Sequence, residues 1–144
     1  MAVDVTTEIV IARPCEQVAA YAGDPSNAPE WYANIASVEW QTPPPVGVGS
    51  RLDFVARFLG RTLAYTYEVV EHDPRRLVMR TAQGPFPMET TYTWQPEGSG
   101  TRMTLRNRGE PAGFATVTAP VMAAAMRRAN RKDLTRLKQI LEAR

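Results

Sequence analysis

The side chains best suited to chemistry lie on an apolar helical face near the C-terminus of the chain. Residues 117–144 place Met122, Met126 and Leu137 on one side at about 100° per residue. Asp133 projects within this apolar face, and Asn130 lies at its margin. Because buried polar groups are normally hydrogen-bonded, we expect Asp133 to pair with an arginine, a tyrosine hydroxyl or backbone N–H groups. Alternatively, Asp133 and Asn130 are polar anchors in a ligand cavity.

Tyrosine hydroxyls are the other candidate orienting groups. Tyr65 and Tyr67 share one face of a predicted strand, and Tyr92 lies on the inner face of another. A tyrosine presents an apolar ring and a hydrogen-bonding end, so it can orient a mainly apolar ligand. Proton transfer would need a group whose pKa is near the working pH. Only Asp133, if buried without a partner, meets that condition, because burial raises the pKa of a carboxyl.

The single histidine and the single cysteine offer little chemistry. His72 stands beside Asp73 and Pro74 at a predicted hairpin, where polar residues are expected regardless of function. Cys15 excludes an internal disulfide and has no neighbouring base in the sequence. Since no phosphate-binding loop, nucleophile elbow or metal-spaced cluster is present, we expect no metal site and no cofactor.

Strands must position these groups against the C-terminal helix. Apolar and polar residues alternate, as in strands with one buried face, in residues 7–12, 35–40, 50–58, 62–71, 77–81, 86–95 and 102–108. Two short helices are expected after the first strand, over residues 15–21 and up to Trp31. The order of strand, two short helices, six strands and a long helix predicts an α+β fold in a single domain of residues 1–144.

Charge and composition narrow the choice of partners. Residues 127–144 hold seven Lys/Arg and two Asp/Glu, but no aromatic residues are interleaved with them, so a solvated outer face is favoured and no nucleic acid is expected. There is no apolar run long enough for a membrane-spanning helix, so we expect no integral membrane association. The N-terminus lacks the regions of a signal peptide, and we expect a cytoplasmic protein. A homodimer is left open.

Several motifs together resemble one superfamily. They are IVIARPCEQV at residues 9–18, Asp24 with Trp31, GVGSR at 47–51, EVVEHDPRRLV at 68–78, GTRMTL at 100–105 and DLTRLKQILE at 133–142. In this order the chain resembles the START-related, polyketide cyclase/dehydrase-like superfamily (SRPBCC), whose fold is the helix-grip. The resemblance implies a curved seven-stranded antiparallel sheet wrapped around the C-terminal helix, with a cavity between them. Asp133 belongs to the last motif, which favours a structural role for it.

The predicted inner face combines aromatic residues with methionines, which suits an adaptable apolar pocket and equally suits a solid core. We expect a cavity of about 300 Å³ or more, with Trp31 near its mouth. The predicted ligand-binding residues are Trp31, Phe54, Tyr65, Tyr67, Met79, Met88, Tyr92, Met103, Met126, Asn130 and Asp133.

Two functions are compatible with these features. The first is binding or carrying a hydrophobic, ring-containing small molecule, since the inner face lacks a complete set of acid and base residues. The alternative is a cyclase, aromatase or dehydratase that acts on a polyketide-like chain in the same cavity. A third reading is a protein-interaction module that uses the basic helix face. The sequence identifies no catalytic residue.

Overall fold

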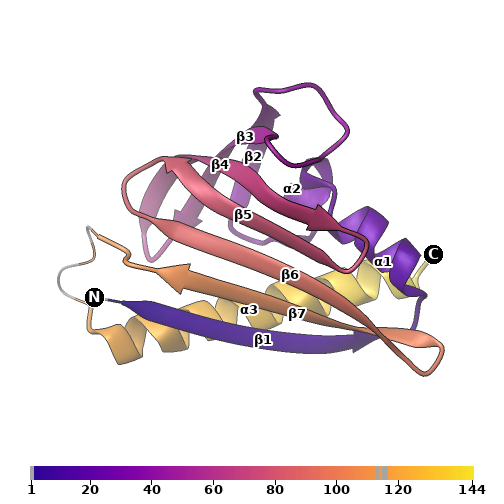
Figure 1. The fold of residues 1–144 in the computed structure, drawn as a ribbon. Coiled ribbons are helices and arrows are strands. Elements are labelled where there is room, and N and C mark those ends of the chain that lie inside the picture. The colour runs from indigo at the N-terminus through magenta and orange to yellow at the C-terminus, as the bar shows by residue number, and fades with distance from the viewer. Residues whose placement is uncertain (1, 113, 115–116) are drawn as a thin grey trace.

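The computed structural model describes residues 2–112, 114 and 117–144. The seven strands form one sheet in which every neighbouring pair is antiparallel, in the order β1-β7-β6-β5-β4-β3-β2. They are β1 (Val3–Ile11), β2 (Ile35–Trp40), β3 (Arg51–Phe58), β4 (Arg61–Asp73), β5 (Arg76–Gln83), β6 (Met88–Glu97) and β7 (Gly100–Gly109) (Figure 1).

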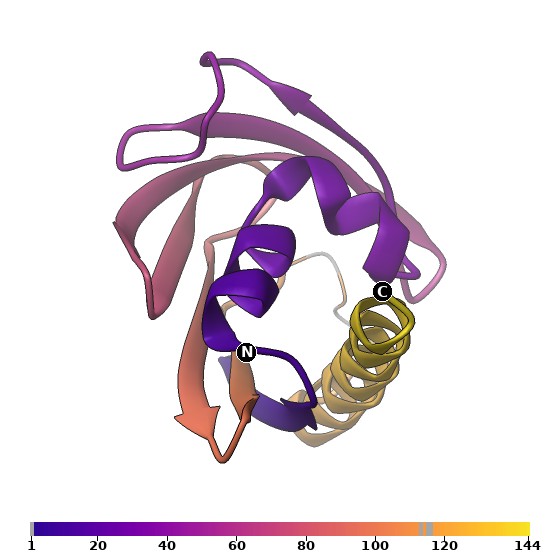
Figure 2. The same ribbon diagram turned by 90° about the vertical axis from the view of Figure 1, so that its right-hand side faces the viewer.

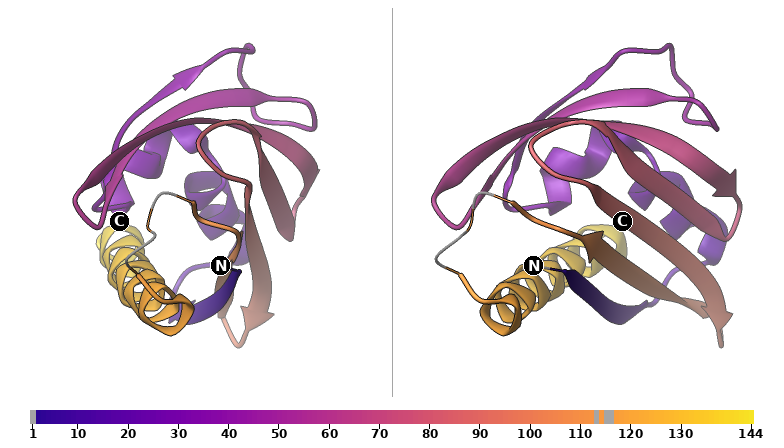
Figure 3. Two further views of the ribbon diagram at one scale, coloured as in Figure 1. Left: turned by 90° about the vertical axis from the view of Figure 1, so that its left-hand side faces the viewer. Right: turned by 60° about the vertical axis from the view of Figure 1, so that its left-hand side comes forward.

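The helices lie on the concave side of this sheet. They are α1 (Cys15–Ala22), the 3₁₀ turn η1 (Pro25–Asn27), α2 (Ala28–Trp31) and α3 (Ala119–Glu142). Figure 2 shows the sheet curling round, with α1 and α2 across the near end and α3 along the open side. The views from the opposite side show the start of α3 close to the N-terminal end of β1 (Figure 3). The predicted helix-grip architecture and its α+β class are confirmed.

Period-two alternation specifies which face of each strand is buried. In β3, Leu52, Phe54 and Ala56 are buried, whereas Arg51 and Arg57 are exposed. The same alternation continues across the sheet because neighbouring strands keep their inward residues in register, as Trp94 and Ile9 do with Met103. A one-residue slip would turn the apolar side chains outward, so the pattern specifies the register.

The long helix begins two residues later than its expected start at residue 117. Pro120 lies in the first turn, where its missing N–H costs no hydrogen bond. Its buried residues are Met122, Met126, Asn130, Asp133, Leu134, Leu137 and Leu141, so polar groups share the buried stripe. Leu134, Leu137 and Leu141 join the larger core cluster, and Met122 and Met126 join a second one with Val3, Val5, Leu63 and Phe114.

The C-terminal half of α3 is also held to β1 and the residues just after it. Lys138 Nζ donates to the Val10 carbonyl at 2.8 Å, and the Ala12 N–H donates to Glu142 Oε2 at 2.8 Å. Arg13 donates to the Glu142 carbonyl at 2.6 Å. These contacts fix the position of the helix along the sheet.

Strand β6 begins later than its sequence suggests. Phe86 was expected on this strand, but the ladder begins at Met88. Pro85 and Pro87 flank Phe86, and a proline has no N–H to give to a ladder. Phe86 therefore lies in the connection between β5 and β6.

None of the helices in the described part of the chain combines the length and the apolar character that crossing a bilayer requires.

Packing of α3 should dominate stability. Leu137 is fully buried, and Leu137→Ala should lower the free energy of unfolding by about 2–5 kcal/mol through lost burial and the cavity it leaves. The matched control is Gln139→Ala, two residues away on the exposed face, which should change it by less than about 0.5 kcal/mol. Urea unfolding of both variants measures this, and equal effects would contradict the packing described.

Candidate functional site

A cavity of about 140 Å³ lies between α3 and the concave face of the sheet. Its walls come from the inner faces of β3 to β7, from α3, from the segment that joins α1 to β2, and from the connection before β6. Members of both core clusters line it. The expectation of a cavity of 300 Å³ or more, which was based on the usual size of ligand pockets, was wrong, because side chains fill more of the space between helix and sheet.

Most residues that the sequence nominated for ligand binding do line this cavity. They are Phe54, Tyr65, Tyr67, Met79, Met88, Tyr92, Met126, Asn130 and Asp133. The structure thus brings together side chains from β3, β4, β5, β6 and α3 around one space.

Trp31 and Met103 do not line the cavity, which corrects the expectation for both. Trp31 is only 1% exposed and packs against Tyr32 and Tyr92, with ring centroids 4.1 and 5.7 Å away. It lies behind the rings that form the wall and is not at a mouth. Met103 is fully buried beside its ladder partner Trp94, where the core is solid.

Five polar wall residues were not nominated for ligand binding: Tyr32, Asn34, Thr81, Thr90 and Asn107. Thr90 and Asn107 lie on the inward phase of β6 and β7, so strand alternation was the signal that could have found them. Tyr32 and Asn34 follow the four-residue helix α2, where no periodicity indicates direction.

Hydroxyl groups form two linked sets on the wall. Tyr32 OH and Tyr92 OH lie 2.6 Å apart. Thr90 Oγ1 donates to Asn107 Oδ1 at 2.6 Å, and so Tyr67 OH, 2.9 Å away, donates to Thr90. Burial raises the pKa of Tyr32, Tyr65 and Tyr92 well above the usual value, and raises that of Tyr67 to about 12. These tyrosines are therefore neutral near pH 7 and can act as hydrogen-bonding groups but not as bases.

Asp133 has one of the three kinds of partner that the sequence analysis left open, a backbone N–H. The Ala33 N–H donates to Asp133 Oδ1 at 3.0 Å, which ties α3 to the segment between α2 and β2. Burial is the main influence on this carboxyl and raises its pKa from 3.8 to about 6, while the hydrogen bond from Ala33 and the charge of Lys132 oppose the rise. Asp133 is 2% exposed and also lines the cavity, so the structural and the cavity-lining readings both describe it.

Comparison with known proteins agrees with this architecture. The family described as polyketide cyclase / dehydrase and lipid transport matches residues 2–142. The chain belongs to this family. No protein of curated function matches the sequence.

Solved structures share the fold of this polyketide cyclase/dehydrase family member. TTHA0849 of Thermus thermophilus has a TM-score of 0.83 at 24% identity over 97% of each chain. A START superfamily protein of Mycobacterium smegmatis has a TM-score of 0.83 at 16% identity, also over 97% of each chain. The ZhuI aromatase/cyclase of Streptomyces sp. R1128 has a TM-score of 0.78 at 16% identity over 99% of this chain and 94% of that one. At these identities the likeness shows a common fold.

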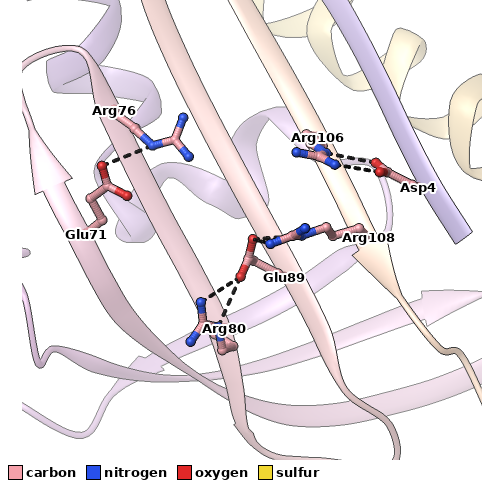
Figure 4. A network of polar contacts seen from close by, with 7 residues as sticks. All are labelled: Asp4, Glu71, Arg76, Arg80, Glu89, Arg106 and Arg108. Carbon is pink, nitrogen blue, oxygen red and sulfur yellow. Dashed lines mark hydrogen bonds and ion pairs between the residues drawn. The ribbon is translucent and has the colours of Figure 1, made fainter. Parts of the chain in front are cut away.

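Three arginines of this family member's sheet, Arg80, Arg106 and Arg108, lie on the face away from the cavity (Figure 4). Arg61, at the start of β4, instead stacks on the ring of the wall residue Phe114, 5.2 Å from its centroid. Arg80 and Arg108 both pair with Glu89, at 2.9 and 2.8 Å, and Arg106 pairs with Asp4 at 2.6 Å (Figure 4). Burial alone would raise the pKa of Glu89, but the hydrogen bonds from Arg80 and Arg108 lower it. Among the described residues that line the cavity, none is Lys, Arg or His.

The remaining candidates for chemistry lie apart from the cavity. Neither His72 nor Cys15 belongs to its wall. The described residues contain no cluster of three or more His, Cys, Asp or Glu side chains that could hold a metal ion.

Asp133 should make the protein less stable as the pH rises above 4. Its pKa is higher in the folded state than in the unfolded state, so between the two values the folded state binds more protons and loses stability with rising pH. The rise from 3.8 to about 6 corresponds to about 3 kcal/mol at neutral pH. Urea titrations give the free energy of unfolding of Asp133→Asn minus that of wild type. This difference should increase by about 2 kcal/mol from pH 4.5 to pH 7.5.

Asp53→Asn is the control, because the contribution of Asp53 to stability should change with pH in the opposite direction. Hydrogen bonds from Thr66 and Gln41 lower the pKa of Asp53, so its stabilisation is present at neutral pH and is lost as the pH falls. The free energy of unfolding of Asp53→Asn should therefore be lower than that of wild type at neutral pH, and this difference should become smaller as the pH falls. Parallel pH profiles for Asp133→Asn and wild type would contradict the burial described for Asp133.

Proposed function

We propose that the protein binds a small, hydrophobic, ring-containing molecule in the cavity between α3 and the sheet. The observation that carries the proposal is an apolar cavity of about 140 Å³ whose wall also presents hydroxyl and amide groups. Ligand sites have this composition, with mainly apolar walls and a few polar groups that fix orientation.

The volume indicates the size of ligand. An engineered protein cavity of about 150 Å³ lined by apolar side chains binds benzene, so a cavity of about 140 Å³ is of the size that suits one six-membered ring. A larger ligand requires side chains to move. Met79, Met88 and Met126 line the cavity, and methionine is the side chain that adapts most readily to a new shape.

An enzyme of the cyclase, aromatase or dehydratase type is the second candidate, and one observation favours it. Burial raises the pKa of Asp133 to about 6, which suits proton transfer near neutral pH, and the same carboxyl lines the cavity. Size favours the binding function, because a polyketide-like chain of several rings exceeds 140 Å³. Native mass spectrometry of freshly purified protein, with the bound compound then identified, would reveal the ligand class.

Filling the cavity should abolish binding of a single-ring compound. Ala56 is 5% exposed and lines the cavity, so Ala56→Leu places a larger side chain inside it. The control is Ala64→Leu on the neighbouring strand, where the side chain is exposed. Toluene titrated into ¹⁵N-labelled protein should shift signals of wall residues in wild type and in Ala64→Leu but not in Ala56→Leu.

Circular dichroism would establish that both variants are folded, since overpacking costs about 1–3 kcal/mol. Equal binding by all three proteins would place the ligand elsewhere, and no binding by wild type would refute the proposed function for ligands of this size.

A further inference from the structure

Two side-chain amides in the cavity wall each have a buried polar atom without a partner in the described structure. They are Asn130 Nδ2 and Asn34 Oδ1. Asn130 is 5% exposed and both residues line the cavity. A buried donor or acceptor without a partner is destabilising, because it has lost its hydrogen bonds to water. Asn130 therefore presents an unpaired donor and Asn34 an unpaired acceptor.

The two amides lie at the same end of the cavity. Asn34 follows Ala33, whose N–H binds Asp133 at 3.0 Å. Asn130 precedes Asp133 by three residues on α3, a spacing that puts side chains on the same face one turn apart. The hydrogen bond between Ala33 and Asp133 therefore holds the segment that carries Asn34 against the turn of α3 next to Asn130.

The charge of this end restricts which polar group can bind there. Asp133 is the carboxyl that lines the cavity, and the described wall residues include no Lys, Arg or His. Arg80, Arg106 and Arg108 pair with carboxylates on the far side of the sheet (Figure 4). An anionic ligand would be buried beside a carboxyl without a counter-charge, which is unfavourable.

From these observations we infer that the cavity selects phenols, with the ring against the aromatic and methionine wall and the hydroxyl between Asn130 and Asn34. A phenol hydroxyl donates one hydrogen bond and accepts another, so one group satisfies both unpaired amide atoms. A single phenol ring also fits the volume of about 140 Å³. This inference rests on the proposed function and adds the chemical class of the ligand. The alternative occupant of the polar end is a bound water molecule.

The test compares phenol with toluene, which has a methyl group in place of the hydroxyl. Dissociation constants for both are measured by NMR titration of wild type and of Asn130→Leu, in which the side chain keeps its approximate size but loses its polar atoms. Toluene is the more hydrophobic compound, so the informative quantity is the ratio of its dissociation constant to that of phenol. This ratio should fall about 10-fold or more in Asn130→Leu, because the hydroxyl loses a partner.

Asn34→Leu is the second variant, and it should shift the ratio in the same direction. Because Asn34 is only partly buried, this variant tests the inference even if Asn130→Leu does not fold. Gln139→Leu on the exposed face of α3 is the matched control and should leave the ratio unchanged. Benzoate, an anionic ring of similar size, should not bind to wild type.

Three other results of these titrations would overturn the inference. Binding of both compounds with the same ratio in wild type and in the folded Asn variants would overturn the inference and assign the polar end to water, while the proposed function would stand. Binding of benzoate as tightly as phenol would also overturn it. Failure of wild type to bind either neutral compound would overturn the inference and the proposed function together.

Discussion

Burial of one face of α3 against the concave side of the sheet is the interaction on which the rest of the structure depends. The helix has 24 residues, so it is about 36 Å long and crosses the whole domain. Its leucines pack in the larger core cluster and its methionines in the smaller one. Without this helix, many inward side chains of the strands would face water, because α1 and α2 lie across only one end of the sheet (Figure 2).

The same interface separates two electrostatic environments. Ion pairs of arginine and carboxylate occupy the outer sheet face, where solvent reduces their energetic value. Inside, neutral hydroxyls and amides surround the buried carboxyl of Asp133, which has one backbone N–H as its partner. A low local dielectric makes each unpaired group inside costly, and it equally strengthens any hydrogen bond that a ligand completes there. A few polar groups would therefore be enough to orient the proposed ligand.

The fold could be predicted from the sequence because two hydrophobic periodicities, one in the strands and one in the long helix, indicate which faces are buried. Alternation in strands such as β3 identifies the inner face, and the apolar stripe of α3 identifies what covers it. The site could be predicted only where residues lie on these periodic elements, as Tyr65 and Asn130 do. Tyr32 was missed and its neighbour Trp31 chosen instead, because a four-residue helix gives no reliable direction. Met103 shows that an inward residue contacts the cavity only where the core leaves a gap. The cavity volume depends on the fit of many side chains, which no local pattern encodes.

The hydrogen bonds between α3 and the β1 region have a consequence for self-association. A sheet has two outer strands whose unpaired backbone groups can recruit a strand from another molecule. In this sheet β1 is one of the outer strands. Lys138 donates a hydrogen bond to the carbonyl of Val10, and Glu142 accepts one from the N–H of Ala12, just after the strand. The other, β2, is six residues long, has a register shift between Ile35 and Ser37, and is followed by the prolines at 43–45. Short, irregular outer strands resist edge-to-edge pairing. The chain thus blocks one route to aggregation with its longest helix and the other with the irregularity of its shortest strand.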